Sequence, residues 1–374
     1  MGSAYVPGLK VLENTKLQVE RRLPLKGRVK VRVGERVSHE QIVAETEIPG
    51  RVEMINLAAR LGLEADDLPS HMLCKVGDSV RQGQELARSE SFWGLFKSSW
   101  PAPISGTLES VSEVSGQAVL RAPAQKVTVQ AYVDGTVSSV LKDEGVIVET
   151  CGALVQGIFG VGGESAGIVH CAVKEPGETL TPELIRSEYR GSVVIGGSLL
   201  TLQAVRRALE VGVNGLVAGG IDDETLKEIL GYDLGVAITG SEQLGLTLII
   251  TEGFGSIAMA QRTFELFKRH EGELASISGA TQIRAGVIRP EIIIPSSGAA
   301  QKESQAPPEL SLEVGAVVRL IREPHFGALA TVSSLPAELV SIPTGARVRV
   351  AEIKLQDGSR MLIPRANLEI IAGS

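Results

Sequence analysis

One stretch decides the fold of the middle of this chain: Val193-Val194-Ile195-Gly196-Gly197-Ser198. The β-branched residues predict a short buried strand, and the paired glycines predict the turn that ends it. Ser198 can cap a following helix, because a serine hydroxyl accepts hydrogen bonds from the free N–H groups of a first helical turn. The same phrase returns at Leu216 to Gly220. Strands that alternate with helices at this spacing predict a parallel sheet with right-handed crossovers.

The alternation continues toward the C-terminus. Asp222 starts a predicted helix that Gly231 stops. Two further strands are predicted at 236–238 and at Leu246 to Ile250, and a last helix is predicted from Ser256 to His270. The strand at 246–250 is apolar apart from Thr247, which is typical of a strand that is buried on both faces.

The composition limits the chemistry of the chain. A formal charge of −7 over 374 residues argues against a nucleic-acid backbone as the main partner, without excluding a locally basic face. The three cysteines, Cys74, Cys151 and Cys171, lack metal-ligand spacing, so we expect reduced thiols in a cytoplasmic protein. The longest apolar run, Leu246 to Ala260, is broken by Glu252 and by glycines, so no membrane segment is predicted.

The N-terminal part contains a hairpin pattern. Residues Val76 to Leu86 resemble the hairpin of biotinyl and lipoyl carrier domains, and 102–108 and 116–120 resemble their second half. The closer resemblance is to the barrel-sandwich hybrid domain found in Rnf-type electron-transport complexes and their sodium-pumping relatives, although the cysteine clusters that bind iron–sulfur centres are absent. Carrier domains attach their cofactor to the lysine of a Met-Lys-Met turn, whereas Lys97 is flanked by Phe and Ser. We therefore expect a β module that carries no biotin, lipoate or other cofactor.

The C-terminal part follows a run rich in Ser, Gln, Ala and Pro, 296–309, which we expect to be a flexible linker. Beyond it, Val314 to Arg319 and Pro324 to Val332 resemble a KOW motif, which implies an SH3-like β-barrel. That motif occurs in ribosomal and transcription-elongation proteins. From Leu310 onward there are seven Lys and Arg against six Asp and Glu, a balance that favours a protein-docking barrel over a dedicated RNA binder.

The predicted fold class is therefore multidomain and β-rich. We expect a barrel-sandwich hybrid of biotinyl/lipoyl-like type at 1–156 and a small parallel α/β domain at 157–295. The linker at 296–309 then leads to an SH3-like β-barrel of KOW type at 310–374.

Two patterns could indicate catalysis or a metal. Gly163-Glu164-Ser165-Ala166-Gly167 fits the G-x-S-x-G nucleophile elbow, whose serine needs a strand before it and a helix after it. The apolar run Ile168 to Val173 predicts a second strand instead of that helix, so we expect Ser165 to be structural. The adjacent pair His170-Cys171 would point to opposite faces of a strand, and no metal site is predicted. The sequence favours a protein without catalysis, and a serine hydrolase is the alternative.

The glycine-ended strands form the candidate binding site. In open parallel sheets, ligands bind at the carboxyl ends of the strands, where backbone N–H groups can approach an anion. The candidate residues are Gly196, Gly197, Ser198, Gly219, Gly220, Thr251, Gly253, Gly255 and Ser256. A small anionic ligand would place its charge at 251–256, where Glu252 would repel it unless this side chain points aside or holds a ligand hydroxyl. The alternative is that the glycines only form turns.

Three functions are compatible with these patterns. The first is a non-catalytic scaffold or adaptor with other proteins as partners, which the absence of a catalytic set favours. The second is a regulator that responds to a small anion or nucleotide and is linked to transcription or translation through the KOW-like tail, with nucleic acid as a further partner. The third is a hydrolase that uses Ser165.

Overall fold

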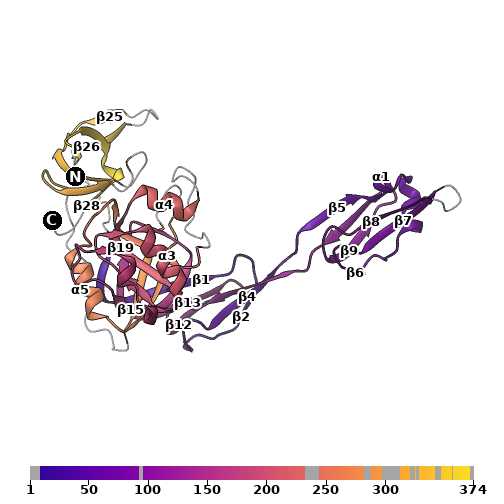
Figure 1. The fold of residues 1–374 in the computed structure, drawn as a ribbon, viewed down its shortest axis with the longest axis horizontal. Helices are drawn as coiled ribbons and strands as arrows, with labels where there is room; N and C mark the ends of the chain where they lie inside the picture. Colours follow the sequence, from indigo (N-terminus) through magenta and orange to yellow (C-terminus); the bar gives the residue numbers. More distant parts are fainter. Residues whose placement is uncertain are drawn as a thin grey trace.

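The computed structural model describes residues 9–91, 96–231, 244–281, 288–296, 312–320, 325, 328–341, 347–355 and 357–370. The protein is elongated and β-rich, with several sheets, one of which is a half-barrel (Figure 1). An arm leaves the side of a larger body, and the C-terminal strands form a separate small sheet on that body (Figure 1). Within these ranges, no helix is long and apolar enough to cross a bilayer. The coarse prediction of a β-rich chain with several sheets is confirmed.

One long sheet runs through the body, in the order β14-β20-β19-β17-β15-β21-β22-β13-β12-β3. Its strands are β3 (Arg36–Val37), β12 (Gly135–Leu141), β13 (Gly145–Gln156), β14 (Phe159–Val161), β15 (Glu164–Cys171), β17 (Val193–Ile195), β19 (Gly215–Ile221), β20 (Thr247–Phe254), β21 (Leu274–Ser278) and β22 (Glu291–Pro295). Strand β1 (Val11–Arg22) pairs with β13 on one side, and β22 pairs with β13 on the other. The sheet therefore continues across residues 156 and 157, the expected boundary between the first two domains.

Four adjacent strands of this sheet, β15, β17, β19 and β20, are parallel to one another. The segments between and after them contain β16 (Thr179–Leu180), η2 (Pro182–Leu184), η3 (Ser187–Tyr189), β18 (Leu199–Leu200), α3 (Leu202–Val211), α4 (Asp223–Leu230) and α5 (Gln261–Arg269). Chain order alternates strand and helix from β17 to α5, as the repeated strand–glycine phrases predict. The predicted strand at 246–250 forms the first part of β20, and the predicted strand at 236–238 lies outside the described residues.

The ends of the helices show which caps follow from the local sequence and which are changed by tertiary contacts. Asp222 caps α4 as predicted, since its carboxylate accepts from the Thr225 N–H, and Gly231 ends the helix at φ 77°. The prediction for Ser198 was wrong, because the short strand β18 intervenes and the Thr201 hydroxyl caps α3. The prediction for Ser256 was also wrong, because α5 begins only at Gln261.

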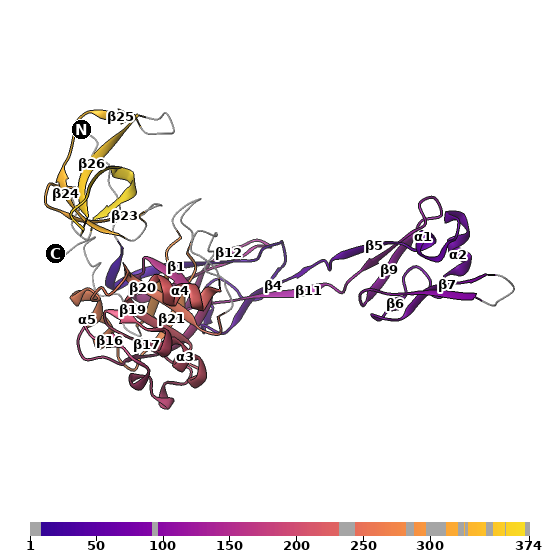
Figure 2. The same cartoon turned by 45° about the horizontal axis from the view of Figure 1, so that its top comes forward.

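The arm carries a distal lobe, residues 52–122, with a hydrophobic core of its own. Its elements are β5 (Val52–Asn56), α1 (Leu57–Leu61), η1 (Ala65–Asp67), α2 (Leu68–His71), β6 (Ser79–Val80), β7 (Glu85–Ser91), β8 (Phe96–Pro101), β9 (Gly106–Val111) and β10 (Gln117–Arg121). A three-stranded sheet, β11-β4-β2, joins the arm to the body; it contains β2 (Arg28–Val29), β4 (Ile42–Ile48) and β11 (Gln125–Gln130) (Figure 2). The first 156 residues thus contribute both to the separate core of the lobe and to the cores of the body.

The C-terminal half-barrel contains β23 (Val317–Leu320), β24 (Leu329–Ser334), β25 (Leu339–Ser341), β26 (Arg347–Leu355), β27 (Arg360–Pro364), η4 (Arg365–Asn367) and β28 (Leu368–Ile370). All its strand pairs are antiparallel, and short aliphatic residues such as Val318, Ala351 and Ile353 fill its core. Of the expected linker at 296–309, only Ser296 falls within the described residues.

Candidate functional site

The chain itself covers the carboxyl ends of the parallel strands. The Gly219 N–H donates to the Gly197 carbonyl at 2.7 Å, within the candidate site. The Ser198 N–H donates to the Glu178 carbonyl at 2.8 Å, and the Ile257 N–H donates to the Ser198 carbonyl at 3.0 Å. Backbone groups that could hold an anion are therefore already used for hydrogen bonds between the strand ends and two neighbouring loops.

The glycines at these strand ends allow close backbone approach. A Cβ atom at Gly220 would overlap the carbonyl oxygen of Gly255, and one at Gly219 would overlap the carbonyl oxygen of Ile257. A Cβ at Gly197 would overlap the carbonyl of Glu178. Glycine is required at such positions because any side chain would separate the two backbones.

The structure brings all nine candidate residues to one end of the sheet, but not all as predicted. Ser198 Oγ donates to the Gly177 carbonyl at 2.8 Å, and Thr251 Oγ1 donates to the Ala218 carbonyl at 3.3 Å. Gly253 is buried in β20 opposite Gly220 of β19. Gly196 is buried, and Gly255 is partly exposed with φ 95°. Ser256 is exposed and caps no helix, so the predicted anion site at a helix N-terminus is not formed there.

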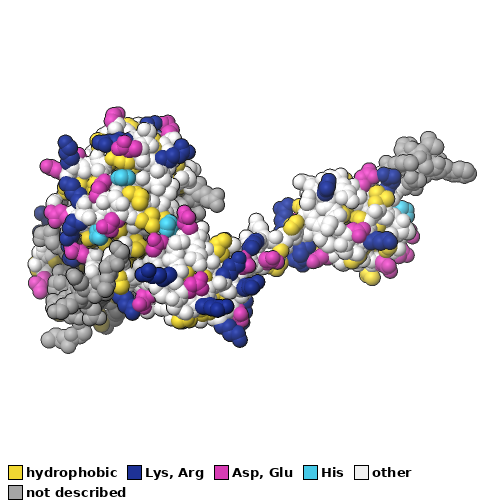
Figure 3. All heavy atoms as spheres, turned by 90° about the horizontal axis from the view of Figure 1, so that it is seen from below, with side chains coloured by type: hydrophobic (Ala, Val, Ile, Leu, Met, Phe, Trp, Pro, Cys, Tyr) yellow, Lys and Arg dark blue, Asp and Glu magenta, His cyan; other side chains and the backbone are white. Residues whose placement is uncertain are grey.

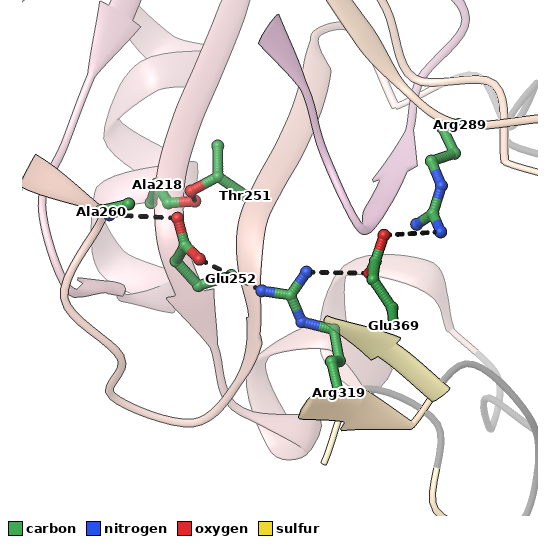
Figure 4. A network of polar contacts seen from close by, with 7 residues as sticks. All are labelled: Ala218, Thr251, Glu252, Ala260, Arg289, Arg319 and Glu369. Atoms are coloured by element: carbon green, nitrogen blue, oxygen red, sulfur yellow. Dashed lines mark hydrogen bonds and ion pairs between the residues drawn. The ribbon is translucent and has the colours of Figure 1, made fainter. Parts of the chain in front are cut away.

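Glu252 has a role that the sequence did not predict. Its Oε1 accepts a hydrogen bond from the Ala260 N–H at 3.1 Å, next to the start of α5. Its Oε2 lies 3.1 Å from Nη2 of Arg319, which belongs to β23 of the half-barrel (Figure 4). The carboxylate at the end of β20 therefore binds a guanidinium from another part of the fold, which explains why a negative charge is tolerated in this apolar strand.

Arg319 and Glu252 are part of a larger buried ion network. We use this name for Glu252, Arg289, Arg319 and Glu369. Arg319 Nη1 lies 3.3 Å from Glu369 Oε2, and Arg289 Nη2 lies 2.9 Å from Glu369 Oε1 (Figure 4). The side chains of Arg319 and Glu369 are 2% and 1% exposed. Two positive and two negative charges balance within the network, as burial requires.

Burial sets the electrostatics of this network. Loss of water raises the pKa of Glu369 above its ordinary value, and the positive charges of Arg289 and Arg319 oppose this change. Loss of water also lowers the pKa of Arg289, against the attraction of Glu369. The charged groups of this arrangement are engaged with one another. The arrangement can hold the half-barrel against the end of the parallel strands, and it depends on each charge keeping its partner.

Two signals in the sequence could have indicated this network. Glu252 is a single charge within the apolar run Leu246 to Ala260, and Arg319 is a single charge within Val317–Leu320. Charged residues in otherwise apolar strands are rarely buried unless they are paired. The sequence shows that each charge is isolated in an apolar segment, but it does not show which charges pair.

Ser165 does not lie at a nucleophile elbow. It belongs to strand β15, which pairs with β17 and β21 on its two sides, so no helix follows it. Its hydroxyl donates to the Asn214 carbonyl at 3.0 Å and bonds Thr247 Oγ1 at 2.9 Å. These bonds link β15 to the residue before β19 and to the first residue of β20, which is a structural role.

The pair His170-Cys171 is held by one carboxylate. Glu271 accepts from His170 Nδ1 at 3.1 Å and from the Cys171 N–H at 2.7 Å. The ring of His170 stacks on Tyr189 at 4.9 Å between centroids. Burial and the neighbouring Glu271 raise the pKa of the Cys171 thiol to about 12, so the reactive thiolate is scarce at neutral pH.

Lys97, the lysine compared with carrier domains, lies in β8 opposite Glu90 of β7. Lys97 therefore lies within a strand pair, one residue after Phe96, which pairs with Ser91. In the described parts of the chain, no three His, Cys, Asp or Glu residues come together as metal ligands could.

A comparison with models of protein families finds none that matches this chain, and a comparison with curated proteins finds no match either.

Proposed function

We propose that this chain is a non-catalytic scaffold or adaptor that presents two protein-binding modules from one rigid body. The observation that carries the proposal is the arm, which holds the distal lobe far from the body and from the half-barrel (Figures 1 and 2). The lobe buries 13 residues in a core that is separate from the core of the body. Such a module can bind a partner without disturbing the rest of the molecule.

The neck between lobe and body is a paired structure. The Ala122 N–H donates to the Arg51 carbonyl at 2.9 Å, and Arg121 Nη1 donates to the Gly50 carbonyl at 3.3 Å. A Cβ at Gly50 would overlap the carbonyl of Ala122, so the two strands of the neck run in close contact. Because two hydrogen-bonded strands connect the lobe to the body, the lobe is more restricted than it would be on two flexible linkers. Such a connection suits a spacer of defined length.

Both modules present apolar side chains to solvent. On the lobe, Val114 is 94% exposed and Met54 is 69% exposed. On the half-barrel, Leu362 is 53% exposed. Each of these side chains supplies little apolar area by itself, but they mark positions on the lobe and on the half-barrel that a bound partner could cover.

The experiment is site-specific photo-crosslinking in cells that express the chain. A photoreactive amino acid at Val114 should capture one protein, and one at Leu362 should capture a different protein. The matched control places it at Leu209 on α3, which is 43% exposed on the body. No product at Val114 or Leu362 beyond that from Leu209 contradicts the scaffold role, as does measurable turnover of a bound metabolite.

A second candidate function is a regulator that responds to a small anion and acts through the half-barrel. The observation that favours it is the pairing of Glu252 with Arg319, because an anion that competed for Arg319 would weaken the contact between half-barrel and body. The KOW-like pattern of the tail links such a response to transcription or translation. Thermal shifts with nucleotides and phosphorylated metabolites test it, because binding should depend on Arg319 and be lost in Arg319→Met.

A further inference from the structure

A short segment of this acidic chain is strongly basic. Residues 21–36 contain seven Lys and Arg and one acidic residue, Glu35, whereas the whole chain has a formal charge of −7. The basic residues are Arg21, Arg22, Lys26, Arg28, Lys30, Arg32 and Arg36. A local excess of positive charge in a chain of negative net charge indicates that this surface has an electrostatic role of its own.

The fold displays this segment on the edge of a sheet. Strand β2 is the outer strand of the sheet β11-β4-β2, at the root of the arm. Val31 points inward and is 6% exposed, whereas Arg28, Lys30 and Arg32 are exposed. Alternate residues of an extended chain lie on the same side, about 7 Å apart. Lys and Arg side chains gather on this part of the molecule, where the arm meets the body (Figure 3).

Four of these seven charges have no partner among the residues that the structure describes. Glu45 pairs with Lys30 at 2.7 Å and with Lys126 at 2.8 Å, and the two lysines lower its pKa to about 2. Arg21 pairs with Glu164, and Arg22 pairs with Glu20 and Glu144. The other four cations of the segment are exposed and have no side-chain hydrogen bond or ion pair with any residue that the structure describes. They are Lys26, Arg28, Arg32 and Arg36, which we call the basic stripe.

We propose that the basic stripe binds the phosphate backbone of a nucleic acid without reading its bases. Three of its four residues are arginines, whose planar guanidinium groups donate paired hydrogen bonds to phosphate oxygens. Residues 21–36 contain no aromatic side chain on which a base could stack. Contacts to phosphate alone give affinity and orientation, but no sequence preference.

The shape of the stripe favours a linear polyanion over an anionic bilayer. The cations lie close together along one segment, before and in the edge strand β2, in the turn after it and at the start of β3. Leu25 and Val33 are exposed beside them, at 48% and 64%, and these are the side chains that a bilayer would bury. Two isolated aliphatic side chains supply little apolar area, whereas four cations close together along one segment suit the phosphates of a polyanion.

The test measures fluorescence anisotropy of the full chain with a labelled DNA duplex and the matching RNA duplex. Four phosphate contacts should give a slope of about −3.5 when the logarithm of the association constant is plotted against the logarithm of the salt concentration. R28E/R32E/R36E should weaken binding by at least about tenfold at low salt. The control K75E/R81E/R360E changes three exposed cations elsewhere by the same charge and should bind within about twofold of the unaltered chain.

Three results would overturn the proposal. The first is no duplex binding by the unaltered chain even at low salt. The second is an equal loss in the stripe variant and in the control, because net charge alone would then explain binding. The third is binding to phosphatidylserine vesicles that R28E/R32E/R36E abolishes, without binding to either duplex, which would assign the stripe to a lipid surface. Circular dichroism of both variants shows whether they remain folded.

Discussion

Arg319 of the half-barrel and Glu252 of the body are 67 residues apart in the chain, and their side chains pair at 3.1 Å between Nη2 and Oε2. The two side chains are 2% and 13% exposed, so the pair lies almost entirely out of water. Removing charges from water is unfavourable by several kcal/mol per ion unless partners replace the lost hydration. The contact between half-barrel and body therefore depends on complete pairing within the buried ion network.

Glu252→Gln tests that dependence. Glutamine keeps an oxygen that can accept from the Ala260 N–H, but it removes the charge that faces Arg319. We expect the free energy of unfolding to fall by about 3 kcal/mol, since a buried guanidinium loses a partner. Urea denaturation measures it. The control Arg206→Gln breaks an exposed pair with Glu228 and should lower stability by less than about 1 kcal/mol. If both variants lowered the free energy of unfolding by the same small amount, the buried pair would contribute little to stability.

Gly220→Ala tests whether the strand-end glycines serve packing. The added methyl group would overlap the carbonyl of Gly255, so one backbone must move, and we expect a loss of about 1–3 kcal/mol. Thermal unfolding measures this loss. Gly177→Ala is the matched control in a covering loop, because a Cβ there meets no atom within 4 Å. A stable Gly220→Ala variant would remove the packing explanation and favour a ligand that needs the space.

Local signals were predictable from the sequence, and contacts between distant segments were not. The cap at Asp222 and the stop at Gly231 involve only neighbours in the chain, so residue type alone determines them. Ser198 has the residue type of a cap, but its hydroxyl bonds the Gly177 carbonyl, 21 residues away. Ser256 likewise precedes a segment that crosses the strand ends before α5 begins. Tertiary contacts overrode the local preference at both serines.

The division of the first 156 residues illustrates the same limit. Strands punctuated by glycine occur both before and after Gly50, so the pattern predicts one β module. The structure shows two cores, because the chain leaves the body at Gly50 and returns at Ala122. Nothing in the period of the apolar residues changes at either point. The basic stripe, by contrast, is visible as a local charge excess, which the net charge of the whole chain concealed.

Glu291→Gln should change how stability depends on pH. Burial raises the pKa of Glu291 in the folded state, Glu164 adds to this effect, and Arg21 opposes it. The folded state therefore binds a proton more tightly than the unfolded state, so the contribution of Glu291 to stability falls as pH rises from about 4.5 through the folded pKa. The glutamine variant should be more stable than the unaltered chain at neutral pH. Its stability should also lack the decrease with rising pH that Glu291 causes.

Urea denaturation between acidic and neutral pH checks this prediction. Glu113→Gln, on the exposed surface of the lobe, controls for the loss of one negative charge. A Glu291→Gln variant that is destabilised at neutral pH would mean that the carboxylate makes a net favourable interaction with Arg21.

The Cys171 thiol should resist alkylation in the folded protein. A pKa of about 12 leaves about one thiol in ten thousand as thiolate at pH 8. Iodoacetamide should therefore modify Cys171 far more slowly in the native chain than in urea, as mass spectrometry of the peptide would show. Rapid native modification would mean that Glu271 and burial do not protect the thiol.

The last prediction is that the distal lobe can be removed without unfolding the body. The Ala122 N–H and the Arg51 carbonyl are hydrogen-bonded across the neck, so an Asn-Gly turn in place of residues 52–121 can close the two strands as a hairpin. The lobe and body cores share no residue, so the body should keep its packing and change its thermal midpoint by no more than about 5 °C. Amide spectra should overlay except near the neck. An unfolded body would show that the lobe is an integral part of one cooperative unit, whereas an intact body that has lost only the Val114 crosslink would identify the lobe as a separable binding module.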